Sequence, residues 1–169
     1  MASINGVEVK NLKTFRGHEG EPLYQGSVYL NGKRLGFWSQ DVWCGCDNYD
    51  FNIHLLDSVI EKLRNTSLVE TEYRDIFNAD CLIDKVIRLK NDEKVYKDFC
   101  KKGYQCTLLV TDGYHCFYSA TSNKEAILDK SFALNYFKKQ IDDFSMKCYK
   151  NKFLNVVIYN KPSDFIKNF

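Results

Sequence analysis

Alternating apolar and polar residues on both sides of Asn31-Gly32 predict a β-hairpin. Asn and Gly tolerate the positive φ angles that a two-residue hairpin turn requires. With these two residues as the turn, Val28 lies opposite Leu35, and Gly26 lies opposite Phe37 on the same face. This face is aliphatic and core-like. We therefore expect it to pack against the rest of the protein.

The opposite face of the predicted hairpin mixes polar groups with large aromatic side chains. The same register places Tyr29 opposite Arg34 and Gln25 opposite Trp38. Tyr, Trp and Arg are enriched at binding hot spots. If this face is exposed, Tyr29, Arg34 and Trp38 form a partner-binding patch, to which the nearby Trp43 adds a further aromatic ring. The alternative is that helices pack onto these aromatics, in which case packing accounts for them without any binding partner.

The remaining hydrophobic pattern predicts strands and helices in a mixed order. Further strands are expected over residues 6–15, 104–111, 114–120 and 153–159, and helices over 54–65, 67–77, 80–102 and 122–144. Asp80 is the expected N-cap of the long helix, Gly103 its C-cap, and Asp112-Gly113 the turn of a second hairpin that sets Val110 opposite His115 and Leu108 opposite Phe117. The predicted fold class is α+β, with antiparallel sheets built from two hairpins and terminal strands and packed against about three helices.

The length of 169 residues permits one compact domain over residues 1–169. The alternative is two lobes, residues 1–66 and 67–169. Hydrophobic residues make up 44% of the chain, which argues against disorder. No run approaches the roughly 18 apolar residues of a membrane helix, and the N-terminus shows no secretory signal. Seven cysteines, an odd number, fit a reducing cytosol better than a secreted disulfide scaffold.

Three stretches resemble a family of small uncharacterised proteins from phages and bacteria. They are Lys13–Gly20 (KTFRGHEG), Tyr29–Lys33 (YLNGK), and Gly45-Cys46 with Tyr49, and Glu93–Leu109 is similar to a helix-to-strand passage of the same family. The chain departs from the family pattern at Cys44-Gly45-Cys46, where a double glycine is usual. The resemblance implies an accessory protein carried by a phage or prophage in the cytosol of a bacterial host. It brings no activity and no catalytic residues with it.

Cysteine and histidine offer the main candidates for chemistry. Cys44, Cys46, Cys100 and Cys106 could together form a four-thiolate zinc site, but both spacings differ from the usual two to four intervening residues. Buried structural thiols are the favoured interpretation. His115-Cys116 is not a catalytic pair on this evidence, because neighbouring residues of a strand point to opposite faces. We expect no cofactor, and an unrecognised Cys/His enzyme ranks last among the functions considered.

Basic residues gather in the C-terminal half. Residues 1–85 hold 9 Lys and Arg against 13 Asp and Glu, whereas residues 86–169 hold 15 against 9. Lys97, Lys101 and Lys102 are therefore the candidate phosphate contacts of a nucleic-acid-binding alternative. The interleaved acids favour an ordinary solvated helix face.

These observations favour a non-catalytic protein that binds a host macromolecule, most concretely one that inhibits a host defence or regulatory protein. A nucleic-acid-associated protein that uses the basic half is the alternative. The expected partner is a host protein; a homodimer is compatible with the sequence, and no membrane partner is expected.

The cysteine spacing yields a first testable prediction. Protein purified without chelator should contain far less than one zinc per chain, because the two pairs have poor spacing for a closed tetrahedral site. Elemental analysis of the purified protein measures this directly. Stoichiometric zinc that disappears in Cys44→Ser and Cys46→Ser would show the prediction to be wrong.

Overall fold

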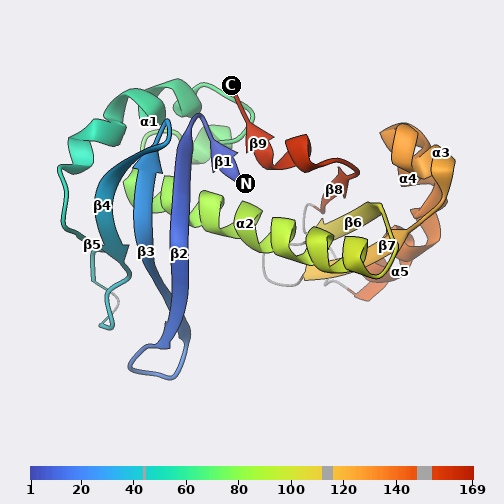
Figure 1. The fold of residues 1–169 in the computed structure, drawn as a ribbon, viewed down its shortest axis with the longest axis horizontal. Coiled ribbons are helices and arrows are strands. Elements are labelled where there is room, and N and C mark those ends of the chain that lie inside the picture. The colour runs from blue at the N-terminus through green and yellow to red at the C-terminus, as the bar shows by residue number, and fades with distance from the viewer. Residues whose placement is uncertain (44, 112–115, 148–153) are drawn as a thin grey trace. The chain divides into compact units, whose positions relative to one another are not determined.

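The computed structural model describes residues 1–43, 45–111, 116–147 and 154–169, and Figure 1 shows its ribbon. The protein is α+β with antiparallel sheets, as the sequence predicted. Its contacts divide it into two compact units: Met1–Lys90 with Phe165–Phe169, and Asn91–Asp164. This division falls after Lys90 rather than after residue 66. Whether the chain behaves as a single domain stays a prediction.

The first unit is built on a six-stranded sheet of order β5-β4-β3-β2-β1-β9. The strands are β1 (Ser3–Ile4), β2 (Val7–Arg16), β3 (Pro22–Leu30), β4 (Lys33–Ser39), β5 (Asn48–Tyr49) and β9 (Ile166–Lys167). All neighbours are antiparallel except β1 and β9. Asn31 and Gly32 have φ angles of 51° and 79°, so the predicted turn between β3 and β4 is confirmed. Asn5 and Gly6, at 44° and 79°, form a similar turn between β1 and β2 that the sequence analysis missed.

The register of the first hairpin differs from the prediction after its first two pairs. Tyr29 pairs with Arg34 as expected, but Val28 pairs with Gly36 and not with Leu35. Leu35 is therefore the extra residue of a β-bulge, and every later position of β4 turns over. As a result Gly26 pairs with Trp38, not with Phe37.

This bulge reverses two of the predicted side-chain positions. Trp38 is 1% exposed and belongs to the core, whereas Phe37 is 38% exposed on the other face. The placement of Trp38 in an exposed binding patch was thus wrong, as was the placement of Phe37 in the core. The core face of the sheet instead carries Trp38 with Val7, Val9 and Val28.

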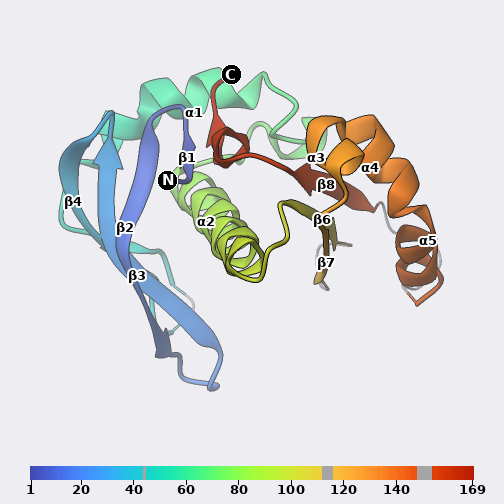
Figure 2. The same cartoon turned by 45° about the vertical axis from the view of Figure 1, so that its right-hand side comes forward.

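Helices of the first unit cover one side of the sheet (Figure 2). A short 3-10 turn, η1 (Ile53–Leu56), leads into α1 (Asp57–Arg64), and α2 (Ala79–Lys101) contributes its first half to this unit. Apolar residues of these helices supply the other side of the core; they are Leu56, Val59, Ile60, Leu63, Leu82, Ile83, Val86 and Ile87. The helix expected over residues 67–77 is reduced to one 3-10 turn, η2 (Thr71–Tyr73).

The long helix keeps its predicted extent, but its cap differs. The side chain of Asn78 accepts a hydrogen bond from the Cys81 backbone N–H at 3.0 Å, so Asn78 caps the helix in place of Asp80. The helix continues without interruption through Asn91 and Asp92. Gly103, with a φ of 89°, takes the expected left-handed conformation after the last turn.

The second unit is a three-stranded sheet of order β7-β6-β8 with short helices. Its elements are β6 (Cys106–Thr111), β7 (Cys116–Thr121), α3 (Lys124–Leu128), α4 (Lys130–Tyr136), α5 (Lys138–Lys147) and β8 (Asn155–Tyr159). Thr111 pairs with Cys116, so Val110 faces Phe117 and Leu108 faces Ser119, two residues beyond the predicted register. The Asp112-Gly113 turn itself, like His115, lies outside the described residues.

Each face of this small sheet has its own packing. Cys106, Leu108 and Val110 point from β6 into a cluster with Ala126, Ala133 and Phe137 of the helical segment. On the other face, the hydroxyls of Tyr118 and Tyr159 both donate to Asp92 of α2, at 2.7 and 2.8 Å. Burial, together with this negative partner, raises the pKa of both phenols, so they stay neutral donors.

Trp38 and Phe37 provide a matched pair for testing the bulge. Trp38→Ala should destabilise the protein by about 3–5 kcal/mol, because it leaves a large cavity in the core. Phe37→Ala should cost no more than about 1 kcal/mol, since Phe37 lies on the outer face of the sheet and more than a third of its surface is already in contact with water. Denaturant unfolding followed by circular dichroism measures both. If Phe37→Ala lowers the free energy of unfolding more than Trp38→Ala does, the bulge is contradicted and the register without it is supported.

Candidate binding surface

Strand pairing places eight side chains in three rows on the face of the sheet that lies away from the core. One row contains Glu8, Tyr29 and Arg34, and the next contains Lys10, Ser27 and Phe37. Lys13 follows in a third row, opposite Gln25. Directly paired residues of neighbouring strands share a face, and rows two residues apart are adjacent. We call the set Glu8, Lys10, Lys13, Tyr29, Arg34 and Phe37 the outer sheet face.

A second bulge, in β2, places Lys10 and Lys13 on the same face of the sheet. Between Lys10 and Lys13 the register of β2 shifts, and Asn11 takes a φ of 53°. Two residues of β2 therefore oppose Gly26, which has no side chain to obstruct them: a Cβ there would come within 2.9 Å of Val9 and 3.0 Å of the Lys10 carbonyl oxygen. Plain alternation would send Lys10 and Lys13 to opposite faces, but the bulge returns both to the outer sheet face.

The outer sheet face combines an aromatic ring with a cation already placed over it. The Lys10 ammonium lies 4.3 Å from the centre of the Tyr29 ring and 3.3 Å from the carboxylate of Glu8. Such contacts hold a long side chain flat against the sheet. Phe37 in the adjacent row remains partly exposed.

Two further cations of this face have no acidic partner. Within the described residues, Lys13 and Arg34 make no ion pair, whereas two of the helical cations of the same unit do: Arg64 pairs with Glu61 at 3.1 Å and Arg88 with Asp84 at 2.8 Å. Strands β2, β3 and β4 contain five Lys and Arg residues and only one acid, Glu8. The outer sheet face is therefore a basic surface on a unit whose charges nearly balance, with 12 Lys and Arg against 13 Asp and Glu.

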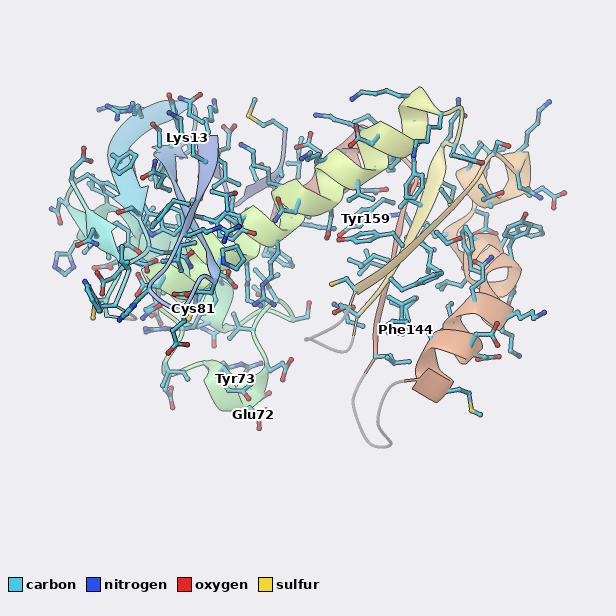
Figure 3. The ribbon with its side chains drawn as sticks, turned by 90° about the horizontal axis from the view of Figure 1, so that it is seen from below. Lys13, Glu72, Tyr73, Cys81, Phe144 and Tyr159 are labelled. Atoms are coloured by element: carbon cyan, nitrogen blue, oxygen red, sulfur yellow. The ribbon has the colours of Figure 1, made fainter. Side chains whose placement is uncertain are left out.

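No described element of the first unit covers this face. Figure 2 shows α1 and the first half of α2 on one side of the sheet only. Figure 3 shows Lys13 on the side of the strands that lies away from α2. The predicted residues Tyr29 and Arg34 are thus brought together on an open surface.

Trp43, which the sequence analysis added to the patch, is exposed, but it lies at the far end of the hairpin. Its side chain is 73% exposed, and its ring meets that of His18 edge-on at 4.3 Å between centroids. The backbone N–H of His18 donates to the Val42 carbonyl at 3.4 Å, so Trp43 belongs with the loop that joins β2 to β3. Tyr29 and Arg34 adjoin the turn at the other end of β3, whose nine residues span about 30 Å. Trp43 is therefore not part of the outer sheet face.

The segment that carries Trp43 is fixed by two hydrogen bonds to the core. The Trp38 indole N–H donates to Asp47 at 2.7 Å, and the Tyr49 hydroxyl donates to Asp80 of α2. Burial raises the pKa of Asp47; the Trp38 hydrogen bond opposes this rise, and the charges of Asp80, Asp84 and Asp41 add to it. Burial likewise raises the pKa of Tyr49, which therefore remains a donor.

Lys97, Lys101 and Lys102, the candidate phosphate contacts, are exposed, but two of the three form ion pairs with acids of the same helix. Lys97 pairs with Glu93 at 2.6 Å and Lys101 with Asp98 at 2.8 Å. Lys102 lies 5.9 Å from the centre of the Phe99 ring. These pairs match the solvated helix face that the interleaved acids favoured.

The cysteines considered as zinc ligands occupy different surroundings. Cys46 is exposed in the first unit, whereas Cys100 is half-buried and Cys106 buried in the second. Burial raises the pKa of the Cys106 thiol to about 11, which disfavours the thiolate that zinc requires. Cys44 lies outside the described residues. Among the residues that are described, no three His, Cys, Asp or Glu side chains converge in a way that would hold a metal ion.

The sequence analysis placed Phe37 in the core because it assumed unbroken alternation, and it did not consider Lys10 and Lys13 as site residues. One signal was present: Gly36 and Gly26 are glycines inside strands, and such glycines often mark bulges. Gly36 is also required by packing, since a Cβ there would lie 2.9 Å from Phe51.

Comparisons of the chain with protein-family models, with curated proteins and with solved structures give no match. In the described part of the chain, no helix has both the length and the apolar character to cross a membrane. The outer sheet face is thus assigned from geometry alone.

The raised pKa of Asp47 predicts how Asp47→Asn changes stability with pH. A carboxyl whose pKa is raised on folding contributes stability that is present below its unfolded pKa and lost as pH rises through the folded pKa. Asn does not titrate. The stability of Asp47→Asn relative to the natural protein should therefore increase as pH rises from about 3.5 upwards, then level off above the folded pKa. Urea unfolding at a series of pH values measures this difference; a constant difference would contradict the raised pKa.

Proposed function

We propose that the protein acts without catalysis, by binding a macromolecule of a bacterial host through the outer sheet face. Its concrete form is an accessory protein of phage type that occupies a host defence or regulatory protein in the host cytosol. The phage setting follows from the resemblance of the KTFRGHEG and YLNGK stretches. The geometry of the sheet supports the proposed binding mode.

The observation that carries the proposal is the combination of partly exposed aromatics with cations that make no ion pair in the described residues, on an uncovered sheet face. Tyr29 and Phe37 offer rigid apolar area, and Arg34 offers a planar guanidinium that makes no ion pair with any described residue. Lys13 adds a second cation without an acidic partner in the described structure. A partner surface with acidic groups around an apolar centre complements this arrangement.

Charge also accounts for specificity in this proposal. Ion pairs formed at an interface steer association and suppress partners of like charge. The rest of the first unit is acidic, so an acidic partner would be repelled from its other surfaces and directed to the outer sheet face. Binding should consequently weaken as salt is added.

Nucleic-acid binding by Lys97, Lys101 and Lys102 is the less favoured function. Exposed ion pairs are weak, so these lysines remain able to exchange an acid for a phosphate. However, each engaged lysine would leave Glu93 or Asp98 beside the incoming phosphate. Non-specific, strongly salt-dependent binding is the most that this arrangement supports.

A charge-reversal experiment tests the proposed surface. Immobilised protein is incubated with bacterial host lysate, and retained proteins are quantified by mass spectrometry for the natural chain, for Arg34→Glu, and for Phe37→Ala. A true partner should be retained by the natural chain and lost at least tenfold in both variants, since hot-spot truncation costs about 2 kcal/mol or more. Its affinity, measured afterwards with the purified partner, should fall with salt.

The matched control is Lys62→Glu, an exposed charge reversal on α1. It changes net charge as Arg34→Glu does but leaves the outer sheet face intact, so retention should persist. If Lys62→Glu loses the partner to the same extent, the change in net charge explains the loss, and the proposal that the outer sheet face binds the partner is wrong. Submicromolar binding to DNA or RNA at physiological salt that is lost on neutralising Lys97, Lys101 and Lys102 would establish the alternative instead.

A further inference from the structure

A separate pocket lies in the first unit, between α2 and the segment that contains η2. Its volume is about 230 Å³. The segment contributes Val69, Glu70, Tyr73, Ile76 and Phe77, and α2 contributes Cys81, Asp84, Lys85 and Arg88. Figure 3 shows Tyr73 and Cys81 on these two elements. None of these residues belongs to the outer sheet face.

The walls of the pocket combine a buried apolar floor with an exposed apolar rim. Val69 and Phe77 are buried, but Tyr73 and Ile76 are 50% and 65% exposed. The segment is held in place by Arg64, whose Nε and Nη2 donate to the Phe77 carbonyl oxygen at 3.2 and 3.0 Å. The segment that carries the exposed rim is therefore held in place by hydrogen bonds. An apolar group of a ligand would cover the exposed side chains of Tyr73 and Ile76.

The charged groups of the pocket leave one cation and one anion unpaired. Arg88 Nε contacts Asp84 at 2.8 Å, so these two charges offset each other. Within the described residues, Lys85 and Glu70 have no ion-pair partner. A ligand that complements this balance carries one negative and one positive group.

The order of residues along α2 gives the pocket an apolar end and a charged end. Cys81 and the buried Phe77 both line the pocket, and Lys85 and Arg88 follow Cys81 one and two turns later, up to about 10 Å along the helix. The pocket is thus apolar near Cys81 and charged near Arg88. Small-molecule sites commonly measure about 300–1,000 Å³. The volume of this pocket is smaller, so it suits a smaller ligand, about the size of a single amino acid.

We propose that this pocket binds a free α-amino acid with an apolar side chain. The side chain would occupy the apolar end beside Phe77 and Cys81, between Tyr73 and Ile76. The carboxylate would face Lys85, with the remaining guanidinium N–H groups of Arg88 nearby, and the ammonium would face Glu70. The site is independent of the partner-binding function, and either can fail without the other.

The test compares L-phenylalanine with two analogues on the natural protein by calorimetric titration. 3-Phenylpropanoate lacks the ammonium group, and 2-phenylethylamine lacks the carboxylate. L-Phenylalanine should bind at least about tenfold more tightly than either, because each analogue leaves one pocket charge uncompensated. Equal affinity of all three, or no detectable binding of L-phenylalanine, overturns the proposal.

Variants assign the two charges separately. Lys85→Met should weaken L-phenylalanine and 3-phenylpropanoate but leave 2-phenylethylamine unchanged, and Glu70→Gln should weaken L-phenylalanine and 2-phenylethylamine while leaving 3-phenylpropanoate unchanged. This crossed pattern cannot arise from a general loss of folding. Lys62→Met, on α1 away from the pocket, is the control and should leave all three affinities unchanged. Loss of all three affinities in Lys85→Met, or of any in the control, counts against the assignment.

Cys81 provides a local readout of occupancy. Saturating L-phenylalanine should slow alkylation of the Cys81 thiol several-fold, as measured by peptide mass spectrometry, because the ligand's side chain covers it. Exposed Cys46 in the same protein is the internal reference and should react at an unchanged rate. Binding that leaves the Cys81 rate unchanged would place the ligand elsewhere and overturn the site.

Discussion

One inserted residue in β4, Leu35, decides which side of the first sheet each later side chain of that strand occupies. Because side chains alternate with a period of two, a single extra residue exchanges the buried and exposed sets. Trp38 enters the core and donates to Asp47, and Phe37 joins Tyr29 on the surface. The position of the core tryptophan, the anchoring of the following segment and the composition of the outer sheet face all depend on this bulge.

The bulge in β2 has the complementary effect on charge. It places Lys10 and Lys13 on one face although they are three residues apart, and Gly26 provides the space for it. Together the two bulges collect cations and aromatic rings on the side of the sheet that no described helix of the unit covers. A regular sheet with the same residues would have divided the basic groups between the two faces. It would also have buried Phe37 and exposed the tryptophan.

Carboxylates that accept hydrogen bonds support both units, whereas several charged groups that we assign to binding make no ion pair in the described structure. In the second unit, Asp92 is held by two tyrosine hydroxyls, and Asp164 by Lys130 at 2.8 Å and by backbone N–H groups. Burial by itself would raise the pKa of Asp164, but these donors lower it overall. Such satisfied carboxylates act as structural supports. In the first unit, Lys13, Arg34, Lys85 and Glu70 have no charged partner in the described structure, and these residues define the surface and the pocket that we assign to binding.

The sequence by itself determined the α+β class, the Asn31-Gly32 turn, the extent of the long helix and its Gly103 cap. These features depend on local chemistry: positive φ at Asn and Gly, apolar residues at helical spacing, and alternation in strands. It also predicted correctly that Tyr29 and Arg34 face each other, since they adjoin the turn. Only the tertiary structure decided the faces of Phe37, Trp38, Lys10 and Lys13, because a bulge is selected by packing across strands, here Phe51 over Gly36 and Val9 beside Gly26. The pocket along α2 likewise depends on where the segment around Tyr73 folds back, and no local pattern encodes that return.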